Sequence, residues 1–171
     1  MNMFLIDEET IKQKVKELAQ KISKDYENSD NLVVIGVLKG AFIFLADLVR
    51  ELKIPCKVDF IKVSSYGQST QSSGIVRIEL DTSIDIANSD VLIVEDILDT
   101  GLTLKYIKEL ILSRNPRSLK IAVLLDKVER RKIDISADYV GFVVPDKFLV
   151  GYGLDFSENY RNIPYIKELE T

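Results

Sequence analysis

Residues 91–104 combine a hydrophobic run with side chains that can bind a phosphorylated sugar. Two acids, Glu95 and Asp96, follow the run, and the turn Asp99-Thr100-Gly101-Leu102-Thr103 leads into a helical pattern. Glycine permits a tight turn, threonine hydroxyls donate hydrogen bonds, and the first amides of a helix are unpaired, so this turn can cradle a phosphate. Carboxylates accept hydrogen bonds from vicinal hydroxyls or hold Mg²⁺. The combination suits a 5-phosphoribosyl group, although an acid-rich strand end before a helix cap is also frequent without any ligand.

The composition excludes several kinds of catalysis. The chain has no histidine, which rules out Ser-His-Asp and Cys-His triads, His-ligated zinc and acid–base chemistry by histidine. The single Cys56 excludes an intrachain disulfide and fits a reducing cytosol, so we expect a cytoplasmic protein. Any reaction must therefore use carboxylates, lysine, arginine, tyrosine, backbone amides or a metal bound by oxygen atoms.

Length and charge predict one globular domain that binds small molecules. The 171 residues fit a single domain, and 46% hydrophobic with 29% charged residues excludes a wholly disordered chain. The net charge of −4 argues against nucleic acid as the main partner. No apolar run approaches the roughly 18 residues that span a bilayer, and residues 1–4 lack the pattern of a secretory signal. We expect neither a nucleic-acid nor a membrane partner.

Strand and helix patterns alternate along the chain. A period near 3.6 predicts a helix over about 8–28 with Asp7 as its N-cap, and two further helices over about 41–52 and 104–111. Residues 75–80 alternate apolar and charged side chains, as a half-buried antiparallel strand does, and residues 64–74 resemble a mobile loop. Buried-strand patterns cover residues 32–37, 58–63, 91–94, 119–125 and 139–144. The fold class expected is α/β, with a mostly parallel sheet covered on both faces.

In such sheets ligands bind beyond the carboxyl ends of the strands. The segments to search are therefore 38–40, 95–103, 126–131 and 145–161.

Residues 91–104 resemble the phosphoribosyl-pyrophosphate motif of the type I phosphoribosyltransferases: a hydrophobic strand, Glu-Asp, two apolar residues and Asp-Thr-Gly-x-Thr. Other segments resemble the branch of this family that acts on 6-oxopurines, the hypoxanthine-guanine phosphoribosyltransferases, over about residues 5–167. They are Leu38-Lys39-Gly40, Ser64-Ser65-Tyr66-Gly67, Asp126-Lys127 with Arg130-Arg131, residues 145–155 and residues 159–165. The resemblance implies one domain over residues 1–171, with a small hood from the N-terminal residues and about 145–171, and a flexible lid over about 64–74.

The resemblance also implies a reaction. A purine base, hypoxanthine or guanine, and 5-phosphoribosyl 1-pyrophosphate would give a nucleoside monophosphate and pyrophosphate, with Mg²⁺ as the cofactor. Asp99 matches the family's catalytic acid, which accepts or shares the proton on N7 of the base, and a carboxylate within hydrogen-bond reach suits that task. Ser65 and Tyr66 match the residue types of the family's closing lid. A homodimer or homotetramer is expected, since the family commonly forms either.

The remaining site residues are carried over by position. The ribose 5-phosphate would contact Glu95, Asp96, Asp99, Thr100, Gly101, Leu102 and Thr103. Pyrophosphate would contact Lys39, Gly40 and Arg161, with Arg131 a weaker candidate that can equally be a structural charge, as can Arg130. The purine would contact Lys127 through its O6 atom, Phe148 by stacking, Leu149 through its backbone, and Asp155. Glu95, Asp96 and Asp155 are the metal-side carboxylates.

Other functions remain compatible with parts of the pattern. A regulator that senses phosphoribosyl pyrophosphate without catalysis can use the same fold, but it usually needs an added effector domain. A signalling receiver domain also places acids at strand ends, although its acidic pair follows the first strand. A generic nucleotide-binding protein leaves residues 148–155 and 160–165 unexplained. The order of preference among hypoxanthine, guanine and xanthine stays open.

Overall fold

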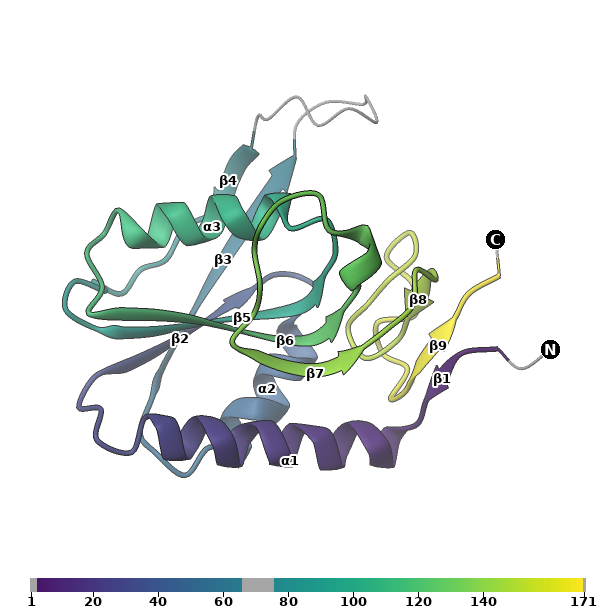
Figure 1. Cartoon of the computed structure of the whole chain (residues 1–171), viewed down its shortest axis with the longest axis horizontal. Helices are drawn as coiled ribbons and strands as arrows, with labels where there is room; N and C mark the ends of the chain where they lie inside the picture. Colours follow the sequence, from purple (N-terminus) through teal and green to yellow (C-terminus); the bar gives the residue numbers. More distant parts are fainter. Residues whose placement is uncertain (1–2, 66–75, 171) are drawn as a thin grey trace.

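A computed structural model describes residues 3–65 and 76–170, which form two β-sheets and three α-helices (Figure 1). A 3-10 helix, η1, covers Val128–Arg130. The helices are α1 (Glu8–Asp25), α2 (Phe42–Glu51) and α3 (Leu102–Leu112). The strands are β1 (Leu5–Ile6), β2 (Leu32–Val37), β3 (Lys57–Ser65), β4 (Val76–Leu80), β5 (Asp90–Leu98), β6 (Ser118–Asp126), β7 (Tyr139–Val143), β8 (Leu149–Val150) and β9 (Ile166–Glu168).

The main sheet is mostly parallel, as the sequence predicts. Its six strands lie in the order β4-β3-β2-β5-β6-β7, and every neighbouring pair is parallel except β3 and β4. The antiparallel strand β4 covers residues 76–80 of the alternating segment, and its half-exposed pattern reflects its place at the sheet edge. The expected α/β fold class is confirmed.

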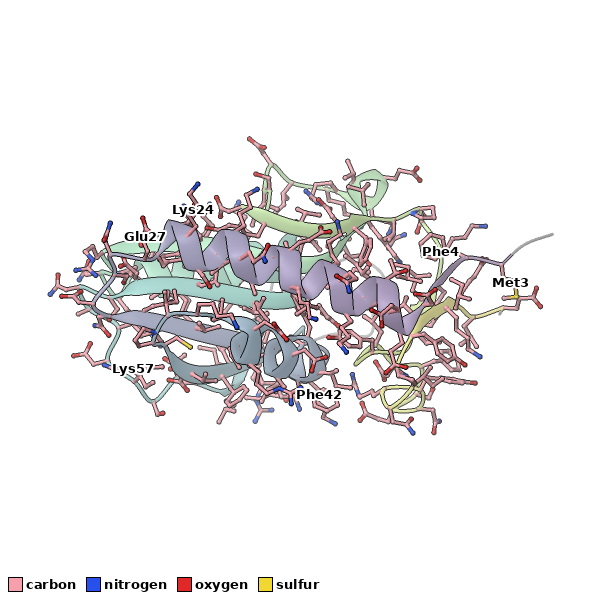
Figure 2. All side chains as sticks on the ribbon, turned by 90° about the horizontal axis from the view of Figure 1, so that it is seen from below. Met3, Phe4, Lys24, Glu27, Phe42 and Lys57 are labelled. Atoms are coloured by element: carbon pink, nitrogen blue, oxygen red, sulfur yellow. The ribbon has the colours of Figure 1, made fainter. Side chains whose placement is uncertain are left out.

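Helices cover both faces of this sheet. In Figure 1 α3 lies on one face, and α1 and α2 lie on the other, where Figure 2 shows them next to each other. Alternate residues of the central strands therefore enter two separate cores. Val34 and Leu92 pack with α1 and α2, whereas Val33 and Ile93 pack with α3. Because both sides are buried, β2 is a continuous apolar run without polar alternation.

The predicted element boundaries hold well at the helices and less well at β5. Asp7 caps α1, since its Oδ1 accepts a hydrogen bond from the Thr10 amide at 2.8 Å. The strand predicted over 91–94 continues to Leu98, so Glu95 and Asp96 lie within the strand rather than after it. The extension follows from the pairing with β6, in which Glu95 lies opposite Val123 and Leu98 opposite Asp126.

A small second sheet joins the two ends of the chain. Its strands lie in the order β1-β9-β8, all antiparallel, and the described ends of the chain lie near each other beside it (Figure 1). This sheet corresponds to the hood expected from the N-terminal residues and residues 145–171. None of the helices in the described part of the chain is long and apolar enough to cross a membrane.

The core on the α3 side predicts a specific stability loss. Ile93 lies in β5 with none of its side chain exposed, so Ile93→Ala should lower the free energy of unfolding by roughly 2 to 5 kcal/mol. Urea denaturation followed by circular dichroism measures this loss. The control is Leu112→Ala at the end of α3, where the side chain is 48% exposed and little change is expected. Equal losses in both variants would contradict the core assignment.

Candidate active site

The predicted ligand segments meet where the main sheet reverses its order. From β2 the chain proceeds to β3 and β4 on one side of the sheet, and from β5 it proceeds to β6 and β7 on the other. Ligands bind at such a switch point in open α/β sheets. Gly36 of β2 pairs with Val94 of β5, so the turn at Lys39 and Gly40 comes beside the acids of β5. The peptide bond between Leu38 and Lys39 in this turn is cis.

The turn at Gly40 lies close against the side chain of Asp96. A Cβ atom at this position would overlap the carboxylate of Asp96. The same turn lies against the C-terminal hairpin, since a Cβ atom on Gly153 would overlap the carbonyl oxygen of Gly40. Three segments distant in sequence therefore converge at one point of the sheet edge.

A cavity of about 190 Å³ lies at the end of β5. It is lined by residues 95–101 together with Thr103 and Leu104. Six of the seven residues predicted for the ribose 5-phosphate line it, Glu95, Asp96, Asp99, Thr100, Gly101 and Thr103; Leu102 is the exception. The arrangement offers backbone amides, two hydroxyls and carboxylates to one small ligand group.

The turn Asp99–Thr103 has the conformation that a phosphate cradle needs. Gly101 precedes α3 with a φ of 92°, in the left-handed region that favours glycine. A Cβ atom on Gly101 would also lie 2.5 Å from the Ile135 side chain. The Leu102 amide at the start of α3 donates to Thr100 Oγ1 at 3.4 Å, and this end of the helix carries partial positive charge beside the cavity.

Glu95 and Asp96 form a close acidic pair. The Asp96 amide donates to Glu95 Oε1 at 3.0 Å, and the Ile97 amide donates to Asp96 Oδ1 at 2.8 Å. Burial of the carboxyl group, followed by the adjacent charge of Asp96, raises the pKa of Glu95 well above its usual value. A cation or a hydroxyl donor that enters this site would favour the charged form of Glu95.

Asp99, the predicted catalytic residue, projects toward the segment after β6. Its Oδ1 accepts a hydrogen bond from Arg130 Nε at 3.0 Å, and its side chain is 42% exposed. The same guanidinium lies 3.9 Å from Asp146. Hydrogen bonding to Asp99, and then the charges of Asp99 and Asp146, raise the pKa of Arg130. The sequence did not show whether Arg130 pairs with another side chain or is a surface charge. The pairing depends on how the turn after β5 and the segment after β6 come together.

Arg131 contacts the backbone of the turn Asp99–Thr103. Its guanidinium forms an ion pair with Asp126 and donates hydrogen bonds to the backbone carbonyls of Asp99 and Ile135. Because all of these contacts are to protein groups and only 16% of the side chain is exposed, Arg131 is held as a structural charge in this conformation. Its weaker assignment to pyrophosphate finds no support in this geometry.

Lys127 lies at the adjoining strand end. Its amide donates to the Leu98 carbonyl at 2.9 Å, which ties it to β5, and the residue is only 8% exposed. Within residues 3–65 and 76–170, Lys127 takes part in none of the ion pairs. A buried lysine stem without a carboxylate partner leaves the ammonium available to an acceptor on a ligand.

Two aromatic rings lie at the entrance to the hood. Phe148 and Phe156 are each 45% exposed, with ring centroids 5.6 Å apart and planes at 87°. Phe148 was predicted to stack on a purine, whereas Phe156 was not singled out. Its position directly after Asp155, the last residue of the resembling segment 145–155, was the available signal. Leu149 is buried in β8 and lies opposite Glu168 of β9, so its contact with a ligand would be through the backbone.

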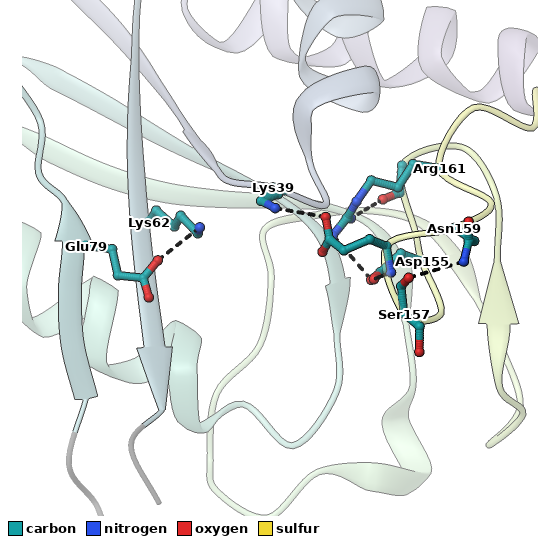
Figure 3. Close-up of polar contacts among 9 residues, drawn as sticks. Lys39, Lys62, Glu79, Asp155, Ser157, Asn159 and Arg161 are labelled. Atoms are coloured by element: carbon teal, nitrogen blue, oxygen red, sulfur yellow. Dashed lines mark hydrogen bonds and ion pairs between the residues drawn. The ribbon is translucent and has the colours of Figure 1, made fainter.

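Two of the three residues predicted for pyrophosphate, Lys39 and Arg161, both contact Glu158, and Figure 3 shows these two side chains beside each other. Lys39 Nζ lies 2.8 Å from Glu158 Oε2, and Arg161 Nη2 lies 3.0 Å from Glu158 Oε1. Arg161 Nη2 also lies 3.4 Å from Asp155, and Arg161 Nη1 donates to the Gly153 carbonyl at 2.7 Å. Hydrogen bonds from Lys39, then from Arg161, lower the pKa of Glu158. Sequence reasoning missed Glu158, whose partner Lys39 is 119 residues away.

The acids predicted for a metal do not form a complete protein-only site. No group of three or more Asp, Glu, Cys or His side chains in the described ranges is arranged to hold a metal ion. Glu95 and Asp96 are adjacent, whereas Asp155 pairs with Arg161. Mg²⁺ is often bound by one or two carboxylates together with substrate phosphates, and this donor set fits that mode.

Two features lie apart from this site. A larger cavity of about 560 Å³ between α1, α2 and the segment 152–164 has none of the predicted site residues in its lining. We assign the candidate site to the smaller cavity because six of the residues predicted for the ribose 5-phosphate line it. Of the predicted lid, residues 64 and 65 end β3, while Tyr66 and the rest lie outside the described residues, so this prediction stays open.

Comparison with known proteins agrees with this geometry. The sequence model of the family described as "Phosphoribosyl transferase domain" matches residues 5–157. The chain is 54% identical to a hypoxanthine-guanine phosphoribosyltransferase of Aquifex aeolicus, over 97% of this chain and 93% of that protein. It is 49% identical to the protein of that name from Dictyostelium discoideum, over 97% and 94% of the two chains.

Solved structures lead to the same family. A crystal structure of a hypoxanthine phosphoribosyltransferase from Staphylococcus aureus is 50% identical, covers 99% of this chain and 91% of its own, and superposes with a TM-score of 0.94. A hypoxanthine-guanine phosphoribosyltransferase from Bacillus anthracis is 46% identical over 99% of both chains, with a TM-score of 0.93. The chain belongs to the phosphoribosyltransferase family, and within it to the hypoxanthine-guanine phosphoribosyltransferases.

Proposed function

We propose that the chain acts in purine salvage by transferring the 5-phosphoribosyl group from phosphoribosyl pyrophosphate to hypoxanthine or guanine. The products would be IMP or GMP and pyrophosphate. The observation that carries this proposal is the cavity at the end of β5, where the turn Asp99–Thr103 and the pair Glu95–Asp96 face one small volume. A non-catalytic regulator on the same fold finds no support in the relatives, which are named as transferases.

The sugar phosphate would be held from two sides. The amides at the start of α3 and the hydroxyls of Thr100 and Thr103 would receive the 5-phosphate, with Gly101 and Leu102 as backbone donors. Glu95 and Asp96 would accept hydrogen bonds from the ribose hydroxyls. Such fixed contacts lower the barrier by holding C1 of the ribose in line with the base.

The base would be recognised by groups from β6 and the hood. Lys127 would donate to O6 of a 6-oxopurine, and adenine offers no acceptor there. Phe148 would stack on the ring, with Phe156 supporting it at its edge. The backbone of Leu149 would contact the other edge of the base, and Asp155 would complete this side of the site.

Bond formation between the base nitrogen and C1 would break the bond to pyrophosphate, which leaves with the bonding electrons. The proton released by the base would pass to Asp99 or be shared with it at N7. Asp99 Oδ1 already accepts a hydrogen bond from Arg130, and Oδ2 has no hydrogen bond to a described residue. Lys39, the Gly40 backbone and Arg161 would stabilise the charge that grows on the leaving group.

Mg²⁺ is the proposed cofactor. Glu95, Asp96 and Asp155 are the residues that would hold it, directly or through water, together with oxygens of the substrate. When bound, the ion would neutralise the diphosphate charge. We further propose a cytoplasmic homodimer or homotetramer that uses these two small-molecule substrates, on the basis of the family resemblance.

The proposed reaction can be tested directly. Purified protein is mixed with labelled phosphoribosyl pyrophosphate and each of hypoxanthine, guanine, xanthine and adenine, with and without Mg²⁺, and the products are separated. Nucleotide should form with hypoxanthine or guanine only when Mg²⁺ is present, and adenine should give none. Absence of product with every 6-oxopurine would refute the proposal.

Asp99→Asn tests the proton acceptor. Loss of a positioned base should lower kcat by about 100-fold or more, because an amide cannot take the proton, while binding of the substrates changes little. Steady-state kinetics with both substrates measure this. Asp134→Asn, a matched charge change at an exposed position, should retain normal turnover. Normal turnover in Asp99→Asn itself would remove the assignment.

Lys127→Met tests recognition of the base while retaining most of the buried stem. Loss of a charged donor should raise KM for hypoxanthine and guanine by roughly tenfold to a hundredfold and leave KM for phosphoribosyl pyrophosphate nearly unchanged. The control is Lys132→Ala, which alters an exposed lysine of the same segment. An equal rise in both KM values would count against a contact with the base.

A further inference from the structure

Glu158 joins Lys39 and Arg161, the two cations assigned to pyrophosphate, in one ion-pair network. Its two carboxylate oxygens face different partners, Lys39 Nζ at 2.8 Å and Arg161 Nη2 at 3.0 Å. A carboxylate that bridges two cations in this way resembles in charge and spacing the oxygens of a phosphate group. Lys39 and Arg161 are therefore paired with a carboxylate of the protein itself.

The two sides of this network differ in how firmly they are held. Arg161 has only 18% of its side chain exposed and is anchored by its hydrogen bond to the Gly153 carbonyl. Its Nε atom is buried and has no hydrogen-bond partner among the described residues. The Glu158 side chain is 63% exposed, and the turn beneath it is held separately by the hydrogen bond from its amide to Asp155. The anion can therefore swing into solvent while the arginine stays in place.

We propose that Glu158 is a tethered anion that occupies the pyrophosphate position in the ligand-free chain and is displaced when phosphoribosyl pyrophosphate binds. This inference rests on the proposed function, since it needs Lys39 and Arg161 to bind the diphosphate. In only a fraction of the free protein is Glu158 displaced from Lys39 and Arg161. The observed dissociation constant of the ligand equals its intrinsic dissociation constant divided by that fraction. Two exposed ion pairs reduce the affinity by about three- to tenfold.

The mechanism makes a selective prediction about ligands. Any ligand that reaches Lys39 and Arg161 must displace Glu158, so pyrophosphate and phosphoribosyl pyrophosphate are affected by the same factor. A nucleoside monophosphate places its phosphate in the cradle at Asp99–Thr103 and does not need the displacement. A general change in surface charge would affect all three ligands in the same direction.

The test is Glu158→Gln, which keeps the side-chain length and the amide contact but removes the charge. The dissociation constant of pyrophosphate, measured by calorimetry with Mg²⁺, and KM for phosphoribosyl pyrophosphate should both fall about three- to tenfold. The dissociation constant of IMP should stay unchanged. The control is Glu17→Gln, which removes an acid with 65% of its side chain exposed from an ion pair with Lys14 on α1 and should change none of the three values.

The outcomes separate this inference from the proposed function. Weaker or unchanged pyrophosphate binding in Glu158→Gln, with wild-type protein that still makes nucleotide, would overturn the tethered anion and leave the transferase function standing. A matching gain in affinity for IMP would also overturn it, since it would indicate a general charge effect. Wild-type protein that binds neither pyrophosphate nor phosphoribosyl pyrophosphate would overturn both proposals.

Discussion

Close approach of distant segments at two glycines is the constraint on which the site depends. Gly40 admits the Asp96 carboxylate against the turn after β2, and Gly153 admits the carbonyl of Gly40 against the hairpin of the hood. At Gly153 the neighbour is backbone, so a Cβ atom would require the chain to shift, whereas at Gly40 the neighbour is the end of the Asp96 side chain. The sheet thereby brings the acids of β5, the turn after β2 and the C-terminal hairpin to one edge, where a bound diphosphate sugar would touch all three.

Several charges at this edge are paired inside the protein, although Lys127 takes part in no ion pair within the described residues. Arg130 pairs with Asp99, Arg131 pairs with Asp126, and Glu158 pairs with the two cations of the hairpin and the turn. Buried charges are costly without partners, so the inner pair of Arg131 and Asp126 is a fixed part of the fold. The outer pairs are more exposed and can exchange partners at lower cost when a charged ligand arrives.

The features that depend on local patterns were predictable from the sequence. The run 32–37 is β2 with the predicted bounds. Except for Leu102, the residues from Glu95 to Thr103 that were assigned to the sugar phosphate line one cavity. The continuation of β5 through Glu95 and Asp96 was not predictable from the sequence, because it results from pairing with β6. The two-residue strands of the hood are too short to show a period. Glu158 was missed because its partner Lys39 comes close only through the fold.

Because the chain has no histidine, carboxylates must serve several roles, and only the surroundings of each carboxylate can make those roles different. Burial and the adjacent charge of Asp96 raise the pKa of Glu95, so its neutral form is favoured until a cation or a hydroxyl donor compensates the charge. Asp99, four residues later, projects from the turn toward Arg130 with 42% of its side chain exposed. The strand fixes the first acid and the loop presents the second. In the proposed function, sugar binding and proton acceptance can then occur in one small cavity, because Glu95 lies in the strand and Asp99 lies in the exposed turn.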